Sequence, residues 1–165
     1  MSRIAFIFPG QGAQTCGMGK DFYEQTETGR KVFDRASDLL GFSVPELCFE
    51  PNDRLDITEY TQAAMVTTSI AMMKVLEERG IHPDVAAGLS LGEYGALAAA
   101  GVMELPDLFR IIRMRGIYMQ EAYPEGGAMA AILGPDGDTV AKICGQTAKE
   151  TGKVVSVANY NCPGQ

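Results

Sequence analysis

The 165-residue sequence has few of the residues that define several protein classes. It contains no Trp and a single His, and its cysteines form no Cys-x-x-Cys pair, so zinc ribbons and thioredoxin-like sites lose their main support. We expect no metal site, and we expect reduced, mostly buried thiols at the four cysteines, which are Cys16, Cys48, Cys144 and Cys162.

Long apolar runs and basic clusters are also missing. No segment approaches the roughly 18 apolar residues of a membrane-spanning helix. The apolar stretch within residues 1–9 is too short for a signal peptide, which predicts a cytoplasmic protein. A net charge of −7 without a Lys/Arg cluster argues against nucleic acid as a partner. With 46% apolar and 21% charged residues, the composition is that of an ordinary globular domain.

Strand and helix patterns alternate along residues 1–124, which predicts an α/β fold with a parallel sheet. Short buried strands are expected at 3–8 and 84–89. Helices are expected at about 19–25, 29–40, 58–79, 91–100 and 106–121. Thr58 is the expected N-cap of the longest helix, whose apolar stripe comprises Met65, Ile70, Met73 and Leu76.

A second subdomain is expected after Gly126-Gly127. Strand patterns at 128–133 and 154–158 flank a helix pattern at 139–151, whose Val140, Ile143 and Ala148 should face inward. The predicted division is therefore 1–124 and 125–165. The sequence stops just past the last predicted strand, so the fold is expected to be incomplete.

The segment Gly88-Leu89-Ser90-Leu91-Gly92 lies where the second strand should meet a helix. A tight turn there presents a serine hydroxyl at the helix N-terminus, where the N–H of Leu91 can stabilise an oxyanion. The pentapeptide alone is a weak signal, because a serine in this place can also be a simple helix N-cap. The strand-like run before it and the small-residue helix after it favour a nucleophile.

Such a nucleophile also needs a second oxyanion donor and a base. The turn at 8–12 follows the first strand, so it should reach the same sheet edge as Ser90, although it could be a plain connection. A phosphate-binding loop is disfavoured because the Walker lysine is missing. His82 lies at the opposite end of the strand that leads to Ser90, about 20 Å away, and is expected in a surface loop.

Arg115 is the remaining candidate. It lies on the predicted 106–121 helix between apolar Met114 and Gly116, and a glycine there costs the helix roughly 1 kcal/mol unless the space is needed. A half-buried arginine can hold a carboxylate through two parallel hydrogen bonds. A solvated helix face is the alternative.

Four segments together make the chain resemble the malonyl-CoA:acyl-carrier-protein transacylases of fatty-acid biosynthesis. The resemblance covers the whole chain, and it is the order and spacing of the motifs that make it specific. The first two motifs are Phe8-Pro9-Gly10-Gln11-Gly12-Ala13-Gln14 and Gly88-Leu89-Ser90-Leu91-Gly92-Glu93-Tyr94. The third is Met114-Arg115-Gly116 with Met119-Gln120. The fourth is Gly126–Ile132, followed by Asn159-Tyr160-Asn161 and Pro163-Gly164-Gln165.

The resemblance implies a cytoplasmic acyltransferase that works through a malonyl-serine intermediate. Ser90 would be the nucleophile, the backbone N–H groups of Gln11 and Leu91 the oxyanion hole, and Arg115 the clamp for the malonyl carboxylate. The partners would be malonyl-CoA and the phosphopantetheine thiol of acyl carrier protein, with no metal or other cofactor. The implied fold is an α/β-hydrolase-like large subdomain carrying a ferredoxin-like small one.

Two departures stand out. Leu89 replaces the His that precedes the serine in many relatives, which costs little because bacterial stand-alone enzymes include a Leu form. The family's histidine base belongs to a downstream Gly-Pro-Phe-His-Ser-like segment that this sequence lacks. The resemblance therefore predicts that the chain alone is inactive and becomes competent with a C-terminal half supplied as a second chain. The alternatives are a serine esterase or lipase of α/β-hydrolase type, and an inactive fragment or interaction module.

Overall fold

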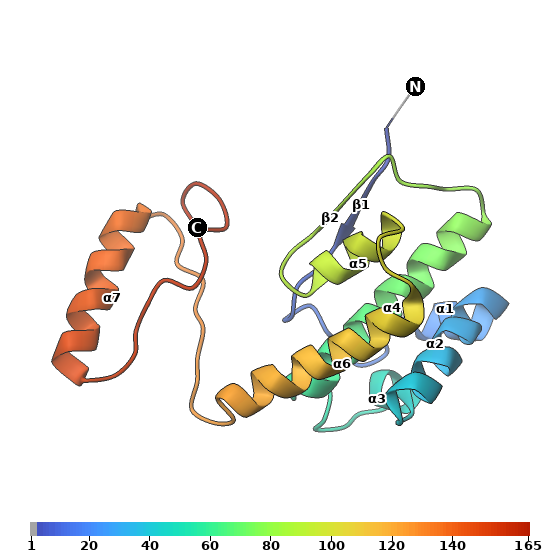
Figure 1. Ribbon diagram of the computed structural model, residues 1–165, viewed down its shortest axis with the longest axis horizontal. Helices are drawn as coiled ribbons and strands as arrows, with labels where there is room; N and C mark the ends of the chain where they lie inside the picture. The colour runs from blue at the N-terminus through green and yellow to red at the C-terminus, as the bar shows by residue number, and fades with distance from the viewer. Residues whose placement is uncertain (1–2) are drawn as a thin grey trace. The chain divides into compact units, whose positions relative to one another are not determined.

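The computed structural model describes residues 3–165, and its internal contacts divide the chain into two units, Met1–Pro124 and Glu125–Gln165. The described part of the first unit follows the predicted α/β pattern (Figure 1). Its elements are β1 Ala5–Phe8, α1 Lys20–Gln25, α2 Glu27–Leu40, α3 Val44–Phe49, α4 Thr58–Glu78, β2 Val85–Gly88, α5 Gly92–Ala99 and α6 Leu105–Ala122. Each helix and strand predicted for this unit is present, with ends within two residues of those expected.

The sheet pairs β1 with β2 in parallel, with Ala5 opposite Val85 and Phe8 opposite Gly88. Alternate residues of a strand point to opposite faces. Phe6 and Phe8 therefore share the face that packs into the core, and Phe8 is buried. Ile7 and Val85 lie on the other face, with 78% and 53% of their surface exposed. One face of this parallel sheet is thus uncovered within the first unit.

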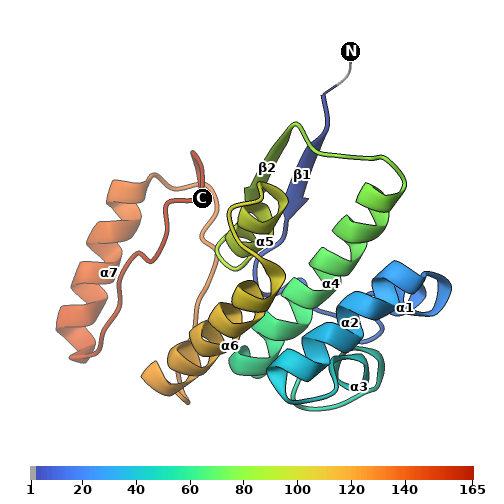
Figure 2. The same ribbon diagram turned by 45° about the vertical axis from the view of Figure 1, so that its right-hand side comes forward.

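Helix α4 forms the centre of the unit because it packs against α2, α5 and α6 (Figure 2). Its predicted apolar stripe is too narrow, since every residue from Thr61 to Thr68 is buried. The predicted cap is also wrong. Thr58 is the first helical residue and Ile57 holds the cap position without a side-chain bond. The backbone N–H of Thr58 instead donates to Gln120 Oε1 on α6 at 3.2 Å.

Helix α3 is absent from the sequence-based prediction. Ser43 caps it by accepting the N–H of Glu46 at 3.2 Å, and its Val44 and Leu47 are buried in the core. A six-residue helix contains fewer than two turns, so its apolar residues set up no clear period. Tertiary packing is what stabilises it.

In the second unit, only part of the expected β-α-β pattern is present. Helix α7 spans Gly137–Thr151, capped by Asp136, which accepts the N–H of Thr139 at 2.8 Å. No residue of 125–165 is in a strand, so the predictions for 128–133 and 154–158 are wrong for this structure. Ile143 is exposed rather than inward. Extended segments become strands by pairing, and these two have no ladder partner here.

The cysteines are free, as expected, but not mostly buried. Cys48 alone is buried, while Cys16 and Cys162 are exposed. Burial raises the pKa of the Cys48 thiol from 9.0 to about 12, because the thiolate would lose its hydration. Among residues 3–165, none of the helices has the length and apolar character that crossing a bilayer requires.

Candidate active site

Ser90 stands at the turn between β2 and α5. Its φ of 51° makes it the one non-glycine residue in the left-handed region among residues 3–165. A left-handed L-residue costs roughly 1–2 kcal/mol, a strain that persists only where the surroundings enforce it. The side chain is solvent-exposed. The predicted strand-to-helix turn is therefore present, with the backbone strain expected of a nucleophile elbow.

The glycines around Ser90 allow the turn to lie against the end of β1. A Cβ at Gly92 would overlap the carbonyl oxygen of Phe8, and one at Gly88 would overlap the backbone of Gly92. The N–H of Leu89 also donates to the Phe8 carbonyl at 3.1 Å. Only a residue without a side chain permits this approach.

The loop that follows β1 reaches the same place. A Cβ on Gly10 would lie 3.1 Å from the carbonyl oxygen of Leu89, so the loop and the elbow are in close contact. Gln11, the next residue, turns its side chain to α4 and donates to Thr58 Oγ1 at 3.2 Å. The convergence expected at one edge of a parallel sheet is thus observed.

Arg115 extends from α6 to the serine. Its Nη2 donates to Ser90 Oγ at 3.2 Å and its Nη1 to Gln62 Oε1 at 2.6 Å. The guanidinium carbon lies 5.6 Å from the centre of the Tyr94 ring on α5. The arginine is half-buried, so it is not on the solvated helix face that was the alternative. With Nη1 held by Gln62, the guanidinium places a charged donor, Nη2, beside the nucleophile, which suits a carboxylate.

Gly116 explains how α6 comes close enough to position Arg115. A Cβ at Gly116 would lie 2.8 Å from Glu59 Cα and 3.1 Å from its carbonyl oxygen. Glycine is needed at position 116 because the backbone of α4 occupies the space that a side chain would take.

Gln62 is a site residue that the sequence-based prediction missed. It is fully buried, and besides accepting from Arg115 it donates to Gln11 Oε1 at 3.4 Å and contacts Met119 Sδ at 3.2 Å. Buried amides are almost always paired. The available signal was therefore the single amide side chain within the longest helix, followed by small and apolar residues.

The described residues bring no histidine to the serine. His82, the single histidine of the sequence, is exposed in the segment that precedes β2, as predicted. Ser90 follows the opposite end of that strand. These residues therefore supply a candidate nucleophile and a cation without an adjacent base.

Comparison with known proteins shows which family has these motifs. The family model described as the acyl transferase domain matches residues 5–162 of the sequence. The chain belongs to the acyl transferase family. It is 47% identical, over its full length, to the malonyl CoA-acyl carrier protein transacylase of Bacillus subtilis, of which it covers 52%.

Solved structures agree with this family assignment. The chain superposes with a TM-score of 0.89 on the malonyl CoA-acyl carrier protein transacylase of Clostridium perfringens, at 41% identity, covering 99% of this chain and 52% of that one. A malonyl-transacylase solved in complex with a type II PKS acyl-carrier protein gives the same TM-score and identity, with 99% and 53% covered. The α/β arrangement of a small parallel sheet with helices therefore matches the fold of this family. The chain spans about half the length of the curated relatives it matches.

Proposed function

We propose that this acyl transferase chain provides the acyl-accepting half of an enzyme that moves a malonyl group from malonyl-CoA to acyl carrier protein in fatty-acid biosynthesis. The observation that carries the proposal is the hydrogen bond from Arg115 Nη2 to Ser90 Oγ at 3.2 Å. It sets a fixed cation within reach of an acyl group on the serine. A malonyl group carries its free carboxylate only one methylene away from the carbonyl that reacts.

The proposed reaction has two transfers. The Ser90 hydroxyl attacks the thioester carbonyl, the C–S bond breaks, and the CoA thiol leaves with the proton. The phosphopantetheine thiol of the carrier protein then attacks the seryl ester and releases the Ser90 hydroxyl. Serine and thiol chemistry account for both steps, so the proposal includes no metal and no further cofactor.

The backbone N–H groups of Gln11 and Leu91 are proposed to stabilise the oxyanion in both steps. The loop contact between Gly10 and Leu89 supports this assignment, because it keeps the two segments together. Leu91 also immediately precedes α5, where helix-terminal N–H groups favour negative charge. Losing one such donor lowers the rate by roughly 10² to 10³.

Arg115 distinguishes this proposal from a serine esterase. Once an acyl group is attached to Ser90, Arg115 Nη2 can release the serine oxygen and bind the acyl carboxylate. Nη1 continues to donate to Gln62 Oε1. An esterase has no use for this cation. We therefore favour a dicarboxylic acyl group over a plain one.

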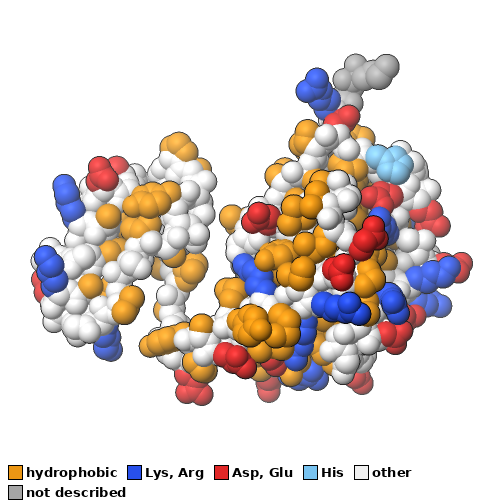
Figure 3. Space-filling view, viewed as in Figure 1, with side chains coloured by type: hydrophobic (Ala, Val, Ile, Leu, Met, Phe, Trp, Pro, Cys, Tyr) orange, Lys and Arg blue, Asp and Glu red, His pale blue; other side chains and the backbone are white. Residues whose placement is uncertain are grey.

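Segments outside residues 1–165 are proposed to complete the enzyme. Parallel sheets are covered on both faces in stable proteins, yet Ile7 and Val85 are exposed on one face of the β1–β2 sheet. In the second unit, Val154 and Met129 are 96% and 80% exposed, and Figure 3 shows apolar side chains on the surface of each unit. These segments, in the same polypeptide or in a second one, carry the remaining strands and the histidine base in this proposal. Residues 1–124 are then the start of an α/β-hydrolase-like subdomain, and 125–165 the start of a ferredoxin-like one.

Mass spectrometry of Ser90 tests the proposal. The chain is incubated with malonyl-CoA, alone and with the C-terminal half of the Bacillus subtilis relative, and the site is located by peptide mapping. We expect a malonyl ester on Ser90 in the mixture and none with Ser90→Ala. If no adduct forms under either condition, the proposed enzymatic activity is refuted, and the alternative of an inactive interaction module is favoured. Equal labelling by acetyl-CoA and malonyl-CoA would favour the esterase.

A further inference from the structure

The amide of Gln11 is held at both ends by one face of α4. Its Nε2 donates to Thr58 Oγ1 at 3.2 Å, and its Oε1 accepts from Gln62 Nε2 at 3.4 Å. Thr58 and Gln62 are four residues apart, so they lie one above the other on the helix. The amide of Gln11 has one favoured orientation, because a flip would set its Nε2 against Gln62 Nε2, which is also a donor.

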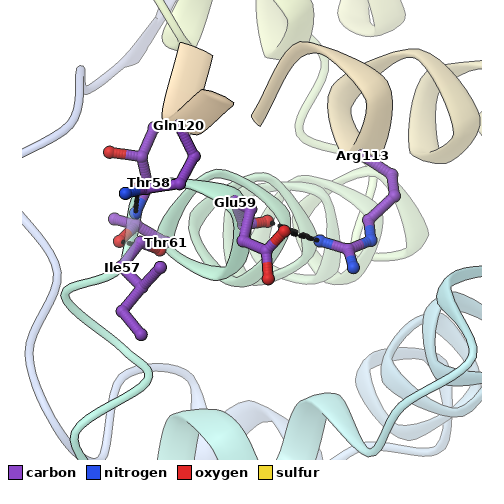
Figure 4. Close-up of polar contacts among 6 residues, drawn as sticks. All are labelled: Ile57, Thr58, Glu59, Thr61, Arg113 and Gln120. Atoms are coloured by element: carbon purple, nitrogen blue, oxygen red, sulfur yellow. Dashed lines mark hydrogen bonds and ion pairs between the residues drawn. The ribbon is translucent and has the colours of Figure 1, made fainter. Parts of the chain in front are cut away.

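Thr58 is itself anchored from the other side. Its backbone N–H donates to Gln120 Oε1 on α6, and Figure 4 shows this contact beside the hydrogen bond that joins Thr61 to Ile57. In the same turn, Arg113 Nη1 lies 3.4 Å from Glu59 Oε2. The first turn of α4 is thus connected to the helix that carries Arg115.

We infer that Thr58 is a positioning residue for the oxyanion loop, acting through the side chain of Gln11. This rests on the proposed function, in which the Gln11 N–H is one of the oxyanion donors. The loop at 9–14 is mostly exposed and contains Gly10 and Gly12, so its backbone has little stiffness of its own. A tether on the Gln11 side chain restricts the N–H of the same residue.

Thr58 and Gln62 have separable effects. Gln62 contacts both Gln11 and Arg115, so changing it disturbs the oxyanion loop and the carboxylate clamp together. Thr58 contacts Gln11 but has no bond to Arg115 among the interactions of residues 3–165. Loss of the Thr58 hydroxyl should therefore slow the chemical step without weakening the binding of the malonyl carboxylate.

Nuclear magnetic resonance of the 165-residue chain tests the tether directly. Thr58→Val removes the hydroxyl and keeps the shape, whereas Thr58→Ser keeps the hydroxyl. Thr28→Val on α2 is the matched control, since Thr28 is also half-buried in the first turn of a helix. We expect the backbone order parameter of Gln11 to be about 0.85 in the native chain, Thr58→Ser and Thr28→Val, and below about 0.6 in Thr58→Val. A mobile Gln11 in the native chain, or a rigid one in Thr58→Val, would overturn the inference.

Kinetics of Ser90 acylation test the consequence, using the chain with the C-terminal half of the Bacillus subtilis relative. We expect Thr58→Val to lower kcat about tenfold with KM for malonyl-CoA unchanged, less than the roughly 10² to 10³ lost with a whole donor. Thr58→Ser should restore kcat. Gln11→Ala should be equally slow, and the double variant no slower than either one, because both changes break the same tether.

The outcomes separate the two proposals. Losses that multiply in the double variant, or a normal kcat in Gln11→Ala, would refute the positioning role even if the native pair is active. A native pair that never acylates Ser90 would refute the proposed function, while the resonance measurement would still decide whether Thr58 restrains Gln11. Thermal unfolding of each variant shows whether a lower kcat reflects less folded protein.

Discussion

Replacing Gly116 by Ala should destabilise the first unit, although the same change in an open helix is stabilising. A Cβ at Gly116 would lie 2.8 Å from Glu59 Cα, whereas carbon atoms pack at about 3.5–4.0 Å. Helices α4 and α6 would have to separate by roughly 1 Å at that point. This would disturb the packing of Phe109 and Ile112, which are fully buried on α6.

The expected magnitude is a balance of two effects. Overpacking a close-packed interface costs about 1–3 kcal/mol, even after partial adjustment. Alanine returns about 1 kcal/mol of helix propensity. Because the contact is with backbone rather than the end of a flexible side chain, we expect the overpacking to dominate. The net loss in the free energy of unfolding should therefore reach up to about 2 kcal/mol.

Gly145 provides the matched control. It lies within α7, and a Cβ there would meet nothing within 4 Å. Gly145→Ala should therefore stabilise its helix by about 0.5–1 kcal/mol. Urea denaturation followed by circular dichroism measures the whole chain, and segment-resolved hydrogen exchange assigns each change to α6 or α7. A Gly116→Ala variant as stable as the native chain would refute the close approach of α4 and α6.

Four further predictions concern the site and the thiols. Ser90→Gly should raise the free energy of unfolding by about 0.5–1 kcal/mol in thermal melts, because glycine adopts a φ of 51° without strain, and Ser90→Ala should not. Arg115→Ala should abolish the preference for malonyl-CoA over acetyl-CoA in Ser90 labelling of the reconstituted pair; an unchanged preference would contradict the clamp. Iodoacetamide at pH 8 should modify exposed Cys16 long before Cys48, whose pKa of about 12 leaves a thiolate fraction of roughly 10⁻⁴. The unfolded chain ionises Cys48 at an ordinary pKa, so this thiol should lower stability as pH rises above about 9, and a Cys48→Ala variant should lack that slope.

The arrangement of elements in the first unit was predictable because local signals agree with the packing. In α2, Val32, Phe33 and Ala36 recur at helical spacing, and the structure buries all three. Gly41 ends that helix with a φ of 77°, a conformation that glycine adopts without cost. Ser90 was predictable in the same way, because a strand, a Gly-x-Ser-x-Gly turn and a small-residue helix follow one another along the chain.

The predicted strands at 128–133 and 154–158 had no such agreement. Their apolar and β-branched residues favour extended backbone, but a strand exists only when another segment accepts its hydrogen bonds. Within residues 125–165, the structure places no such segment beside them. The pattern described a preference of these residues, and pairing decides whether it is realised.

By itself, the sequence determined the α/β order of the first unit, the turn that presents Ser90 and the candidacy of Arg115, since each depends on residues close together in the chain. Only the tertiary structure showed that Arg115 donates to Ser90 and that Gln62 and Thr58 on α4 hold Arg115 and Gln11. Those contacts join residues 25, 47 and 53 positions apart. Periodicity and turn signals act over one or two turns of helix, so they carry no information about which distant side chains meet.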